Sequence, residues 1–263
     1  MAILFSGDFH ANDDGELSSI TEKTLLKKHG QGRFERIKYH IILGDGAFMW
    51  PGNRKTDLFN YEILARRPFP VLCVIGNHEP ILGMRGLPEV DIGIGEAVFQ
   101  IQANPFVAYL KRGQIYTIDG FKMLVLGGAL SIDKSARKPN KTWWEAEYWS
   151  EQEKQDVFKL LENENTFDCV LSHTGPDHIN RSLFDYRTST YSGKFKDEVA
   201  LLNDEIHKRI QFREWFCGHW HRESYFYNTE LKQGYHYLYR KTEILDRVCG
   251  TMVVYNEYEL TEQ

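Results

Sequence analysis

Five short apolar runs, spread between residues 2 and 217, each lead directly into a cluster of polar side chains. The runs span residues 2–5, 40–43, 71–75, 169–171 and 215–217. Short runs of this kind are typical of buried strands in an α/β sheet. Such sheets bind ligands outside the carboxyl ends of their strands. The sequence therefore predicts an α/β (α+β) fold in which five strand ends converge on one rim.

The polar clusters after these runs supply seven candidate metal ligands, which are Asp8, His10, Asp45, Asn77, His173, His219 and His221. Residues two apart in a strand point the same way, so Asp8 and His10 can share an ion. The same holds for His219 and His221 if that stretch stays extended. Mixed carboxylate, amide and imidazole ligands suit Mn²⁺, Fe or Zn²⁺ better than Ca²⁺. Seven ligands exceed the needs of one ion, so the sequence predicts two, with manganese favoured.

Two residues beside these ligands carry candidate catalytic roles. Asp45 follows the second strand and is placed to bridge two ions, which can clamp a phosphoryl group and lower the pKa of a shared water. His78 follows Asn77 and would lie just outside the metals. There it could donate a proton to a leaving alkoxide or stabilise charge on phosphoryl oxygens. Glu79 either orients the backbone or is a solvated loop carboxylate, and both alternatives stay open.

Each motif alone has an ordinary structural explanation, and only their joint order favours a metalloenzyme. An aspartate at a strand end is more often a turn former or a helix cap, and a single buried histidine is usually structural. Five further histidines fit no motif: His29, His40, His178, His207 and His236. The aromatic group at 143–149 favours a packed satellite core over a substrate wall.

The bulk composition limits the class of protein. The motifs run from residue 8 to residue 221, so a single domain over 1–263 is expected. A net charge of −5 gives no support for a non-specific nucleic-acid or anionic-membrane surface and disfavours a nuclease. No run of about 18 apolar residues occurs, and the cysteines lie mostly in apolar runs as expected for buried reduced thiols. We therefore expect a cytoplasmic protein.

Periodicity and turn signals predict the remaining elements. Helices are expected over 17–28, over 56–66, after the capping box Ser150–Glu153, and over 197–210. Further strands are expected over 115–118, 122–127, 224–227, 235–239 and 251–255, with a hairpin turn at Asp119-Gly120. This order predicts two sheets packed together, with helices on the outer faces.

The ordered motifs resemble those of the calcineurin-like metallophosphoesterases. They are Asp8-Phe9-His10, Gly44-Asp45, Gly76-Asn77-His78-Glu79, His173 and Gly218-His219-Trp220-His221, with further similarity at 112–120, 127–129, 131–134 and 143–145 to a bacterial protein-phosphatase-like branch. The resemblance implies a four-layer αββα sandwich. It also implies that Asp8, His10 and His221 hold one metal, that Asn77, His173 and His219 hold the other, that Asp45 lies between them, and that His78 is a catalytic residue but not a ligand.

One departure from the family pattern concerns the second motif. Ser/Thr protein phosphatases continue it with an Asp-Arg pair that braces the catalytic histidine and grips phosphate, whereas this chain has Phe48 and Met49. Those roles must be filled elsewhere, and Arg85 and Arg112 are candidate substrate-binding residues.

The motifs together favour hydrolysis of a phosphate ester by a metal-bound hydroxide. A phosphomonoesterase is the leading subclass, and a phosphodiesterase or nucleotide hydrolase is the alternative. A non-catalytic scaffold that keeps the fold is less favoured, because a scaffold has no use for a full ligand set and His78.

Overall fold

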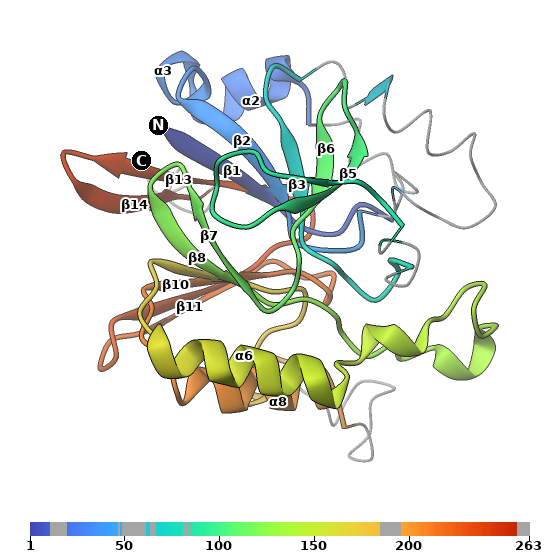
Figure 1. The fold of residues 1–263 in the computed structure, drawn as a ribbon. Coiled ribbons are helices and arrows are strands. Elements are labelled where there is room, and N and C mark those ends of the chain that lie inside the picture. The colour runs from blue at the N-terminus through green and yellow to red at the C-terminus, as the bar shows by residue number, and fades with distance from the viewer. Residues whose placement is uncertain are drawn as a thin grey trace.

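Two β-sheets packed face to face form the centre of the protein in the computed structural model (Figure 1). The structure describes residues 1–10, 20–46, 48, 62–63, 67–80, 84, 86–184 and 196–256. In sheet order, the eight-stranded sheet consists of β14 (Thr251–Tyr255), β13 (Thr242–Val248), β1 (Ala2–Ser6), β2 (Ile37–Ile42), β3 (Val71–Cys73), β6 (Val107–Tyr109), β5 (Val98–Gln102) and β4 (Glu89–Val90). The six-stranded sheet consists of β11 (Ser224–Asn228), β12 (Gln233–Tyr237), β10 (Glu214–Cys217), β9 (Cys169–Leu171), β8 (Phe121–Val125) and β7 (Gln114–Ile118).

Parallel pairing dominates the middle of both sheets. Strands β1, β2, β3 and β6 pair in parallel in the first sheet, and β8, β9, β10 and β12 do so in the second. The outer strands pair antiparallel. Parallel strands place their carboxyl ends at the same edge of a sheet, which is the edge where the polar motifs begin.

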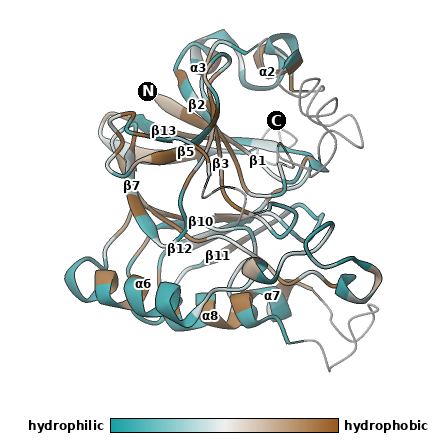
Figure 2. Ribbon diagram, turned by 45° about the vertical axis from the view of Figure 1, so that its right-hand side comes forward, coloured by the Kyte–Doolittle hydropathy of each residue, from teal (hydrophilic) through white to brown (hydrophobic). Residues whose placement is uncertain are grey.

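Helices cover the outer faces of both sheets (Figures 1 and 2). Helices α2 (Glu22–His29) and α3 (Gln31–Phe34) lie over the eight-stranded sheet, and α6 (Glu151–Asn163), α7 (Asp177–Leu183) and α8 (Glu198–His207) lie over the six-stranded sheet. Two 3₁₀ turns, η2 (Lys134–Ala136) and η3 (Glu145–Glu147), occur between β8 and α6. The four-layer αββα architecture that the resemblance implied is confirmed.

Alternating side chains on the strands build three apolar cores between the four layers. On β1, Leu4 faces the core beneath α2 and α3, whereas Ile3 and Phe5 face the core between the sheets. Phe5 stacks on Phe216 of β10, with ring centroids 4.3 Å apart. Trp215 points from β10 into the third core, beneath α6 and α8. Each such fully buried side chain contributes about 1.5–3 kcal/mol, so the strands that carry the polar motifs are held on both faces.

The predicted helices differ from the observed ones mainly at their ends. The capping box at Ser150 and Glu153 is confirmed, and Val157 lies buried on the inner face of α6. Helix α2 begins after an N-cap at Thr21 rather than at residue 17, and residues 17–19 lie outside the described part of the chain. The helix expected over 56–66 falls on undescribed residues except for 62–63, which are helical.

Strand expectations were confirmed where the alternation is apolar and failed where charges are buried. The turn at Asp119 and Gly120 has φ angles of 52° and 80°, which suit a two-residue hairpin loop joining β7 to β8. The sequence analysis missed β4, β5, β6 and β13. Strand β13 reads as polar because Glu243 and Asp246 belong to it, although both are buried.

Cysteine placement also follows the expectation. Cys73, Cys169 and Cys217 are buried and form no disulfide, whereas Cys249 is exposed. Among the described helices, none combines the length and the hydropathy required to cross a bilayer.

Candidate metal centre

The five polar motifs meet where the ends of strands from both sheets come together. β1, β2 and β3 are parallel neighbours in one sheet, and β9 and β10 are parallel neighbours in the other. The two sheets share the rim, because His219 N donates to Asp8 Oδ1 at 3.1 Å and His173 Nε2 lies 3.1 Å from Asn77 Oδ1. The convergence that the apolar runs predicted is confirmed.

Four of the candidate ligands have a left-handed backbone conformation. This conformation, rather than an extended strand, sets the direction of their side chains. The φ angles of His10, Asp45, His219 and His221 are 43°, 50°, 69° and 48°. The expectation that His219 and His221 share a direction through extended structure was therefore wrong. Side-chain-bearing residues rarely adopt this conformation, because Cβ crowds the following carbonyl, and such residues concentrate at functional sites.

Two motif glycines provide space for the carboxylates. A Cβ on Gly76 would lie 2.1 Å from Asp45 Oδ1, and a Cβ on Gly218 would lie 2.4 Å from Asp8 Oδ1. Neither distance is compatible with non-bonded contact, and neither neighbour is the free end of a long side chain. These positions therefore require glycine for close approach of the backbone to the aspartates.

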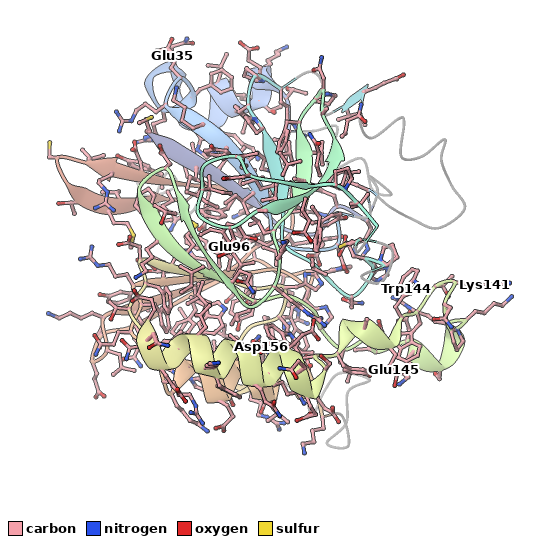
Figure 3. All side chains as sticks on the ribbon, viewed as in Figure 1. Glu35, Glu96, Lys141, Trp144, Glu145 and Asp156 are labelled. Atoms are coloured by element: carbon pink, nitrogen blue, oxygen red, sulfur yellow. The ribbon has the colours of Figure 1, made fainter. Side chains whose placement is uncertain are left out.

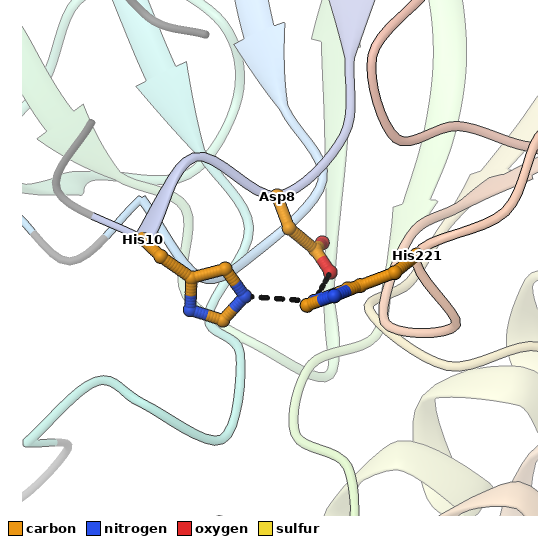
Figure 4. Close-up of side chains that lie close together, drawn as sticks. All are labelled: Asp8, His10 and His221. Atoms are coloured by element: carbon orange, nitrogen blue, oxygen red, sulfur yellow. Dashed lines mark hydrogen bonds and ion pairs between the residues drawn. The ribbon is translucent and has the colours of Figure 1, made fainter. Parts of the chain in front are cut away.

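Three overlapping sets of side chains could hold metal ions, the donor atoms of each set lying within 4.8 Å of one another. The sets are Asp8 with His10 and His221, His10 with Asp45 and His78, and Asp8 with Asp45 and His173. In the first set, His221 Nε2 lies 3.2 Å from Asp8 Oδ2 and 2.8 Å from His10 Nε2 (Figure 4). The sets share residues, so they form one continuous cluster.

His173 is oriented by the end of β2. Its Nδ1 donates to Leu43 O at 2.7 Å, which directs Nε2 toward Asp45 Oδ2 at 3.3 Å and Asn77 Oδ1 at 3.1 Å. A backbone carbonyl on one ring nitrogen is the usual support of a metal-binding histidine. Burial opposes a charged imidazole, but the carboxylates of Asp45 and Asp8 outweigh it and raise the pKa of His173 to about 10. The buried aspartates thus demand positive charge at this position.

His219 lies beside the three sets rather than inside one. Its backbone N–H donates to Asp8 Oδ1 at 3.1 Å, and its ring lies edge-on to that of His173 with centroids 5.0 Å apart. Burial lowers the pKa of His219 to about 3, so the imidazole is neutral and keeps a lone pair for a ligand.

Asn77 is fixed by a chain of hydrogen bonds that the sequence analysis did not anticipate. Its Nδ2 donates to Ser131 Oγ at 3.0 Å, and Ser131 Oγ donates to Glu147 Oε2 at 2.5 Å. The Ser131 N–H also donates to Glu147 Oε1 at 3.2 Å. Because the hydroxyl proton is committed to Glu147, Ser131 Oγ can only accept from Asn77. The amide oxygen of Asn77 must then face His173 and the cluster formed by the three overlapping sets, which we call the donor cluster.

Glu79 orients the backbone of two motifs, which resolves the alternatives left open by the sequence. It is fully buried, and Oε2 accepts from Gly76 N at 2.6 Å and from Asp45 N at 3.2 Å. Tyr109 donates its hydroxyl to the other carboxylate oxygen at 3.2 Å. One carboxylate therefore ties the loop after β3 to the loop after β2.

His78 contacts an arginine that sequence reasoning missed. Arg137 Nη2 lies 2.7 Å from His78 Nε2, which in turn lies 3.7 Å from Asp45 Oδ2. Burial, partly opposed by Asp45, lowers the pKa of His78 to about 4. The available sequence signal was the row of cations at 134–141, which we did not connect to the site. Phe48 is fully buried in the core beneath α2 and α3, so its apolar side chain cannot brace His78.

Of the two arginines suggested by the sequence, the structure describes only Arg112. Arg112 forms a bidentate pair with Glu153 at 3.0 and 2.8 Å and donates to Ala146 O and Tyr148 O. Its guanidinium also lies over the ring of Trp149. These contacts hold Arg112 at the start of α6, and its role in substrate binding stays a prediction. Arg85 and Met49 lie outside the described residues.

The aromatic group at 143–149 is mainly packing, as favoured. Trp144 and Trp149 are buried, and Trp149 Nε1 donates to Gly127 O at 2.7 Å. Trp143 is half-buried, and Lys134 Nζ lies 4.1 Å from its ring centroid. Among the unassigned histidines, His178 pairs with Asp204 at 2.6 Å on the outer helical layer and takes no part in the cluster.

The donor cluster fits metal cations. Asp8 Oδ2 is buried and accepts no well-directed hydrogen bond from the described residues, with only His221 Nε2 close by. Carboxylate and imidazole groups surround it, and no lysine or arginine neutralises Asp8 or Asp45 among the ion pairs of the described residues. A mixed oxygen and nitrogen set of this kind suits Mn²⁺, Fe or Zn²⁺.

The comparisons show the family of this four-layer sandwich with its cluster at the shared rim, and that family supports a metal-dependent phosphoester hydrolase. The model of the calcineurin-like phosphoesterases matches residues 1–223, and the chain belongs to this family. No curated protein sequence matches the chain.

Similar solved structures support the same fold. The protein TT1561 of Thermus thermophilus superposes with a TM-score of 0.53 at 11% identity, covering 97% of this chain and 98% of its own. The phosphopantetheinyl hydrolase of Mycobacterium tuberculosis gives 0.51 at 13% identity, covering 91% and 90%. At these identities the likeness establishes the architecture alone.

Proposed function

We propose that the protein is a dinuclear metal-dependent phosphomonoesterase. The observation that carries the proposal is the overlap of the three donor sets, in which Asp8, His10 and Asp45 each belong to two. Shared residues are what two adjacent cations require, because ions about 3.5–4 Å apart are bridged by common ligands. Membership of the calcineurin-like phosphoesterases supports phosphate-ester chemistry at this cluster.

The proposed ligands divide between two ions. Those of the first are Asp8, His10 and His221, those of the second are Asn77, His173 and His219, and Asp45 lies between. The mixed oxygen and nitrogen donors support manganese, with iron or zinc as alternatives. Arg137 supports a non-ligand role for His78, because a guanidinium and a cation would compete for the same Nε2 lone pair.

The residues of the chain divide the chemical work in this proposal. Bound cations would supply Lewis-acid activation of water and of the phosphoryl oxygens. His78 accepts from Arg137 at Nε2, so its own proton lies on Nδ1 and the ring is neutral at pH 7. A neutral imidazole can stabilise phosphoryl charge as a hydrogen-bond donor, or pass a proton to the leaving oxygen after receiving one.

The substrate class follows from what the second motif lacks. Phe48 is a core residue and cannot replace the aspartate of a Ser/Thr phosphatase. We therefore expect broad, modest activity on small phosphate esters, with no strong preference for phosphoproteins.

The experiment is a substrate profile of the manganese-loaded protein against an aryl phosphomonoester, an aryl phosphodiester, a dinucleotide and a phosphoprotein. The expected result is a higher kcat/KM for the monoester than for the diester or the dinucleotide. The matched control is Asp45→Asn, which should abolish any turnover that belongs to this site. Preference for a diester would show that the protein is a phosphodiesterase instead of a phosphomonoesterase. Two bound ions without turnover of any substrate would favour a non-catalytic scaffold.

A further inference from the structure

A basic arm, defined as residues 131–147, projects from the body of the protein between β8 and α6 (Figures 1 and 3). It carries four cations, Lys134, Arg137, Lys138 and Lys141, and three carboxylates, Asp133, Glu145 and Glu147, so its net charge is +1 in a chain whose net charge is −5. Figure 3 shows Lys141 pointing away from the body at the far end of the arm. The arm therefore brings positive charge to one side of an acidic protein.

Arg137 differs from the other cations of the arm. Its side chain is 11% exposed, whereas Lys134, Lys138 and Lys141 are exposed residues. Arg137 turns back toward the rim, where Nη2 lies 2.7 Å from His78 Nε2. The same imidazole nitrogen lies 3.7 Å from Asp45 Oδ2, so the guanidinium and the carboxylate flank one ring.

The arm itself holds Arg137 in this position. Asp133 Oδ1 pairs with Arg137 Nε at 2.7 Å, and Nη1 donates to Thr142 O at 3.4 Å. The contact with Asp133 fixes the Nε side of the guanidinium, whereas the hydrogen bond to Thr142 O is long. Nη2, by contrast, faces the imidazole nitrogen Nε2 of His78, and a ring nitrogen is a weaker acceptor than an anionic oxygen. The donors nearest the donor cluster can therefore be redirected to a charged ligand at little cost.

We propose that Arg137 is the phosphate-binding arginine of this site. It takes the guanidinium role that Phe48 and Met49 do not fill, and it reaches the site from the basic arm instead of the second motif. Its two terminal nitrogens match the geometry of two phosphoryl oxygens. This inference rests on the proposed function, because it places the substrate phosphate at the donor cluster. Arg137 thereby binds two unesterified oxygens of the substrate phosphoryl group on the side of the arm.

The direct test measures binding of inorganic phosphate to the manganese-loaded protein by calorimetry. Arg137→Gln should weaken the affinity at least tenfold, with unchanged metal content and unfolding midpoint. Arg137→Lys keeps the positive charge but loses the two terminal guanidinium nitrogens, so its affinity for phosphate should lie between those of Arg137→Gln and the wild type. Lys141→Gln is the matched control, since it removes one positive charge from the same arm and should stay within twofold. In steady-state assays, the loss for Arg137→Gln should appear in KM at least as strongly as in kcat.

Several outcomes would overturn the inference in distinguishable ways. Equal phosphate affinity for Arg137→Gln and Lys141→Gln would show that the arm contributes only general charge. Loss of metals in Arg137→Gln would show that Arg137 supports the structure of the metal site. Wild-type phosphate affinity in Arg137→Lys would exclude a role for the paired guanidinium nitrogens. If the metal-loaded wild type binds no phosphate but hydrolyses the monoester, this inference alone fails, whereas absence of both binding and turnover would overturn the proposed function as well.

Discussion

Two clusters of histidines and carboxylates are buried in this protein, and they differ in how their charges are satisfied. The rim cluster surrounds Asp8 and Asp45 at the strand ends. The second, the core cluster, consists of His236 on β12, Glu214 on β10 and Glu243 on β13. Both raise the pKa of a buried histidine, to about 10 for His173 and to about 9 for His236, because carboxylates outweigh the effect of burial.

The core cluster pairs its groups one to one, although the contact between His236 Nδ1 and Glu243 Oε2 is not a well-directed hydrogen bond. His236 Nε2 lies 3.0 Å from Glu214 Oε2, and Nδ1 lies 2.7 Å from Glu243 Oε2, so each ring nitrogen meets one carboxylate. The ring is stacked on Phe216, with Tyr225 on its other side. This cluster joins strands of both sheets and leaves no donor atom directed at a common point.

In the rim cluster, several donor atoms approach one another instead of pairing one to one. Asp8 Oδ2 lacks a well-directed partner among the described residues, several imidazole nitrogens approach one another, and four of the residues have left-handed backbone. Imidazole lone pairs facing each other are unfavourable unless a cation or proton lies between them. The comparison teaches that convergence of several donor atoms on one place distinguishes a metal centre from a structural ion pair, whereas burial, charge or a poorly directed contact occurs in both.

The largest effect should follow from Asp45→Asn. Losing the carboxylate that belongs to two donor sets should leave fewer than two ions bound and lower turnover by at least about three orders of magnitude, or roughly 4 kcal/mol of transition-state stabilisation. Elemental analysis and kcat/KM on an aryl phosphate measure both. The matched variant of the core cluster, Glu243→Gln, should lose stability but bind two ions. Equal metal loss in both variants would contradict the assignment of metal binding to the rim cluster and of a structural role to the core cluster.

His78→Ala should keep both ions while lowering turnover by roughly two to four orders of magnitude. If His78 passes a proton to the leaving oxygen, the loss should shrink for esters with acidic leaving groups. If it stabilises phosphoryl charge, the loss should be similar for alkyl and aryl phosphates. Comparing the two substrate classes decides between these roles. A variant that loses its metals, or that keeps full activity on an alkyl phosphate, would contradict both.

Ser131→Ala should weaken metal binding by roughly 10- to 100-fold, because the Asn77 amide loses the group that sets its orientation. Glu147→Gln should act in the same direction, since it frees the Ser131 hydroxyl. Competition with a chelator measures the affinities. The control is Ser150→Ala, which removes the N-cap of α6 and should cost about 1 kcal/mol of stability without changing metal affinity. Unchanged affinity in Ser131→Ala would remove this chain of hydrogen bonds from the site.

The smallest predicted effect concerns the pH dependence of stability. The pKa of His236 is raised to about 9, so its contribution to stability is fully present below the unfolded-state pKa of about 6.5 and is lost as the pH rises through 9. Between pH 7 and pH 10, the wild type should lose roughly 2 kcal/mol more unfolding free energy than His236→Gln. Urea unfolding at the two pH values tests this. Parallel losses in the two proteins would show that His236 is not charged when folded.

The sequence predicted the strands and their polar ends because both are local properties. An apolar run such as 169–171 indicates a buried strand, and a histidine just after it lies at the strand end in any parallel sheet. Conformation at the motifs was not predictable in the same way. The left-handed backbone of His219 and His221 follows from how the loop after β10 fits around Asp8, which residue type does not encode.

Long-range contacts explain the remaining misses. Arg137 reaches His78 from 59 positions away only because the basic arm folds back toward the rim, and no local pattern encodes that path. The pairing of Arg112 with Glu153 was missed because the sequence analysis interpreted Glu153 only as part of a helix cap, although Glu153 does both. Strand β13 was missed because Glu243 is buried against His236, which reverses the usual meaning of a charge in a strand.

Crystallography of the manganese-loaded protein, with anomalous scattering to locate the metal, tests the central claim most directly. We predict two anomalous peaks within about 4 Å of each other at the rim cluster, with Asp45 touching both and no peak at Glu214 or Glu243. A single peak, a pair remote from Asp45, or occupation of the core cluster would contradict the account.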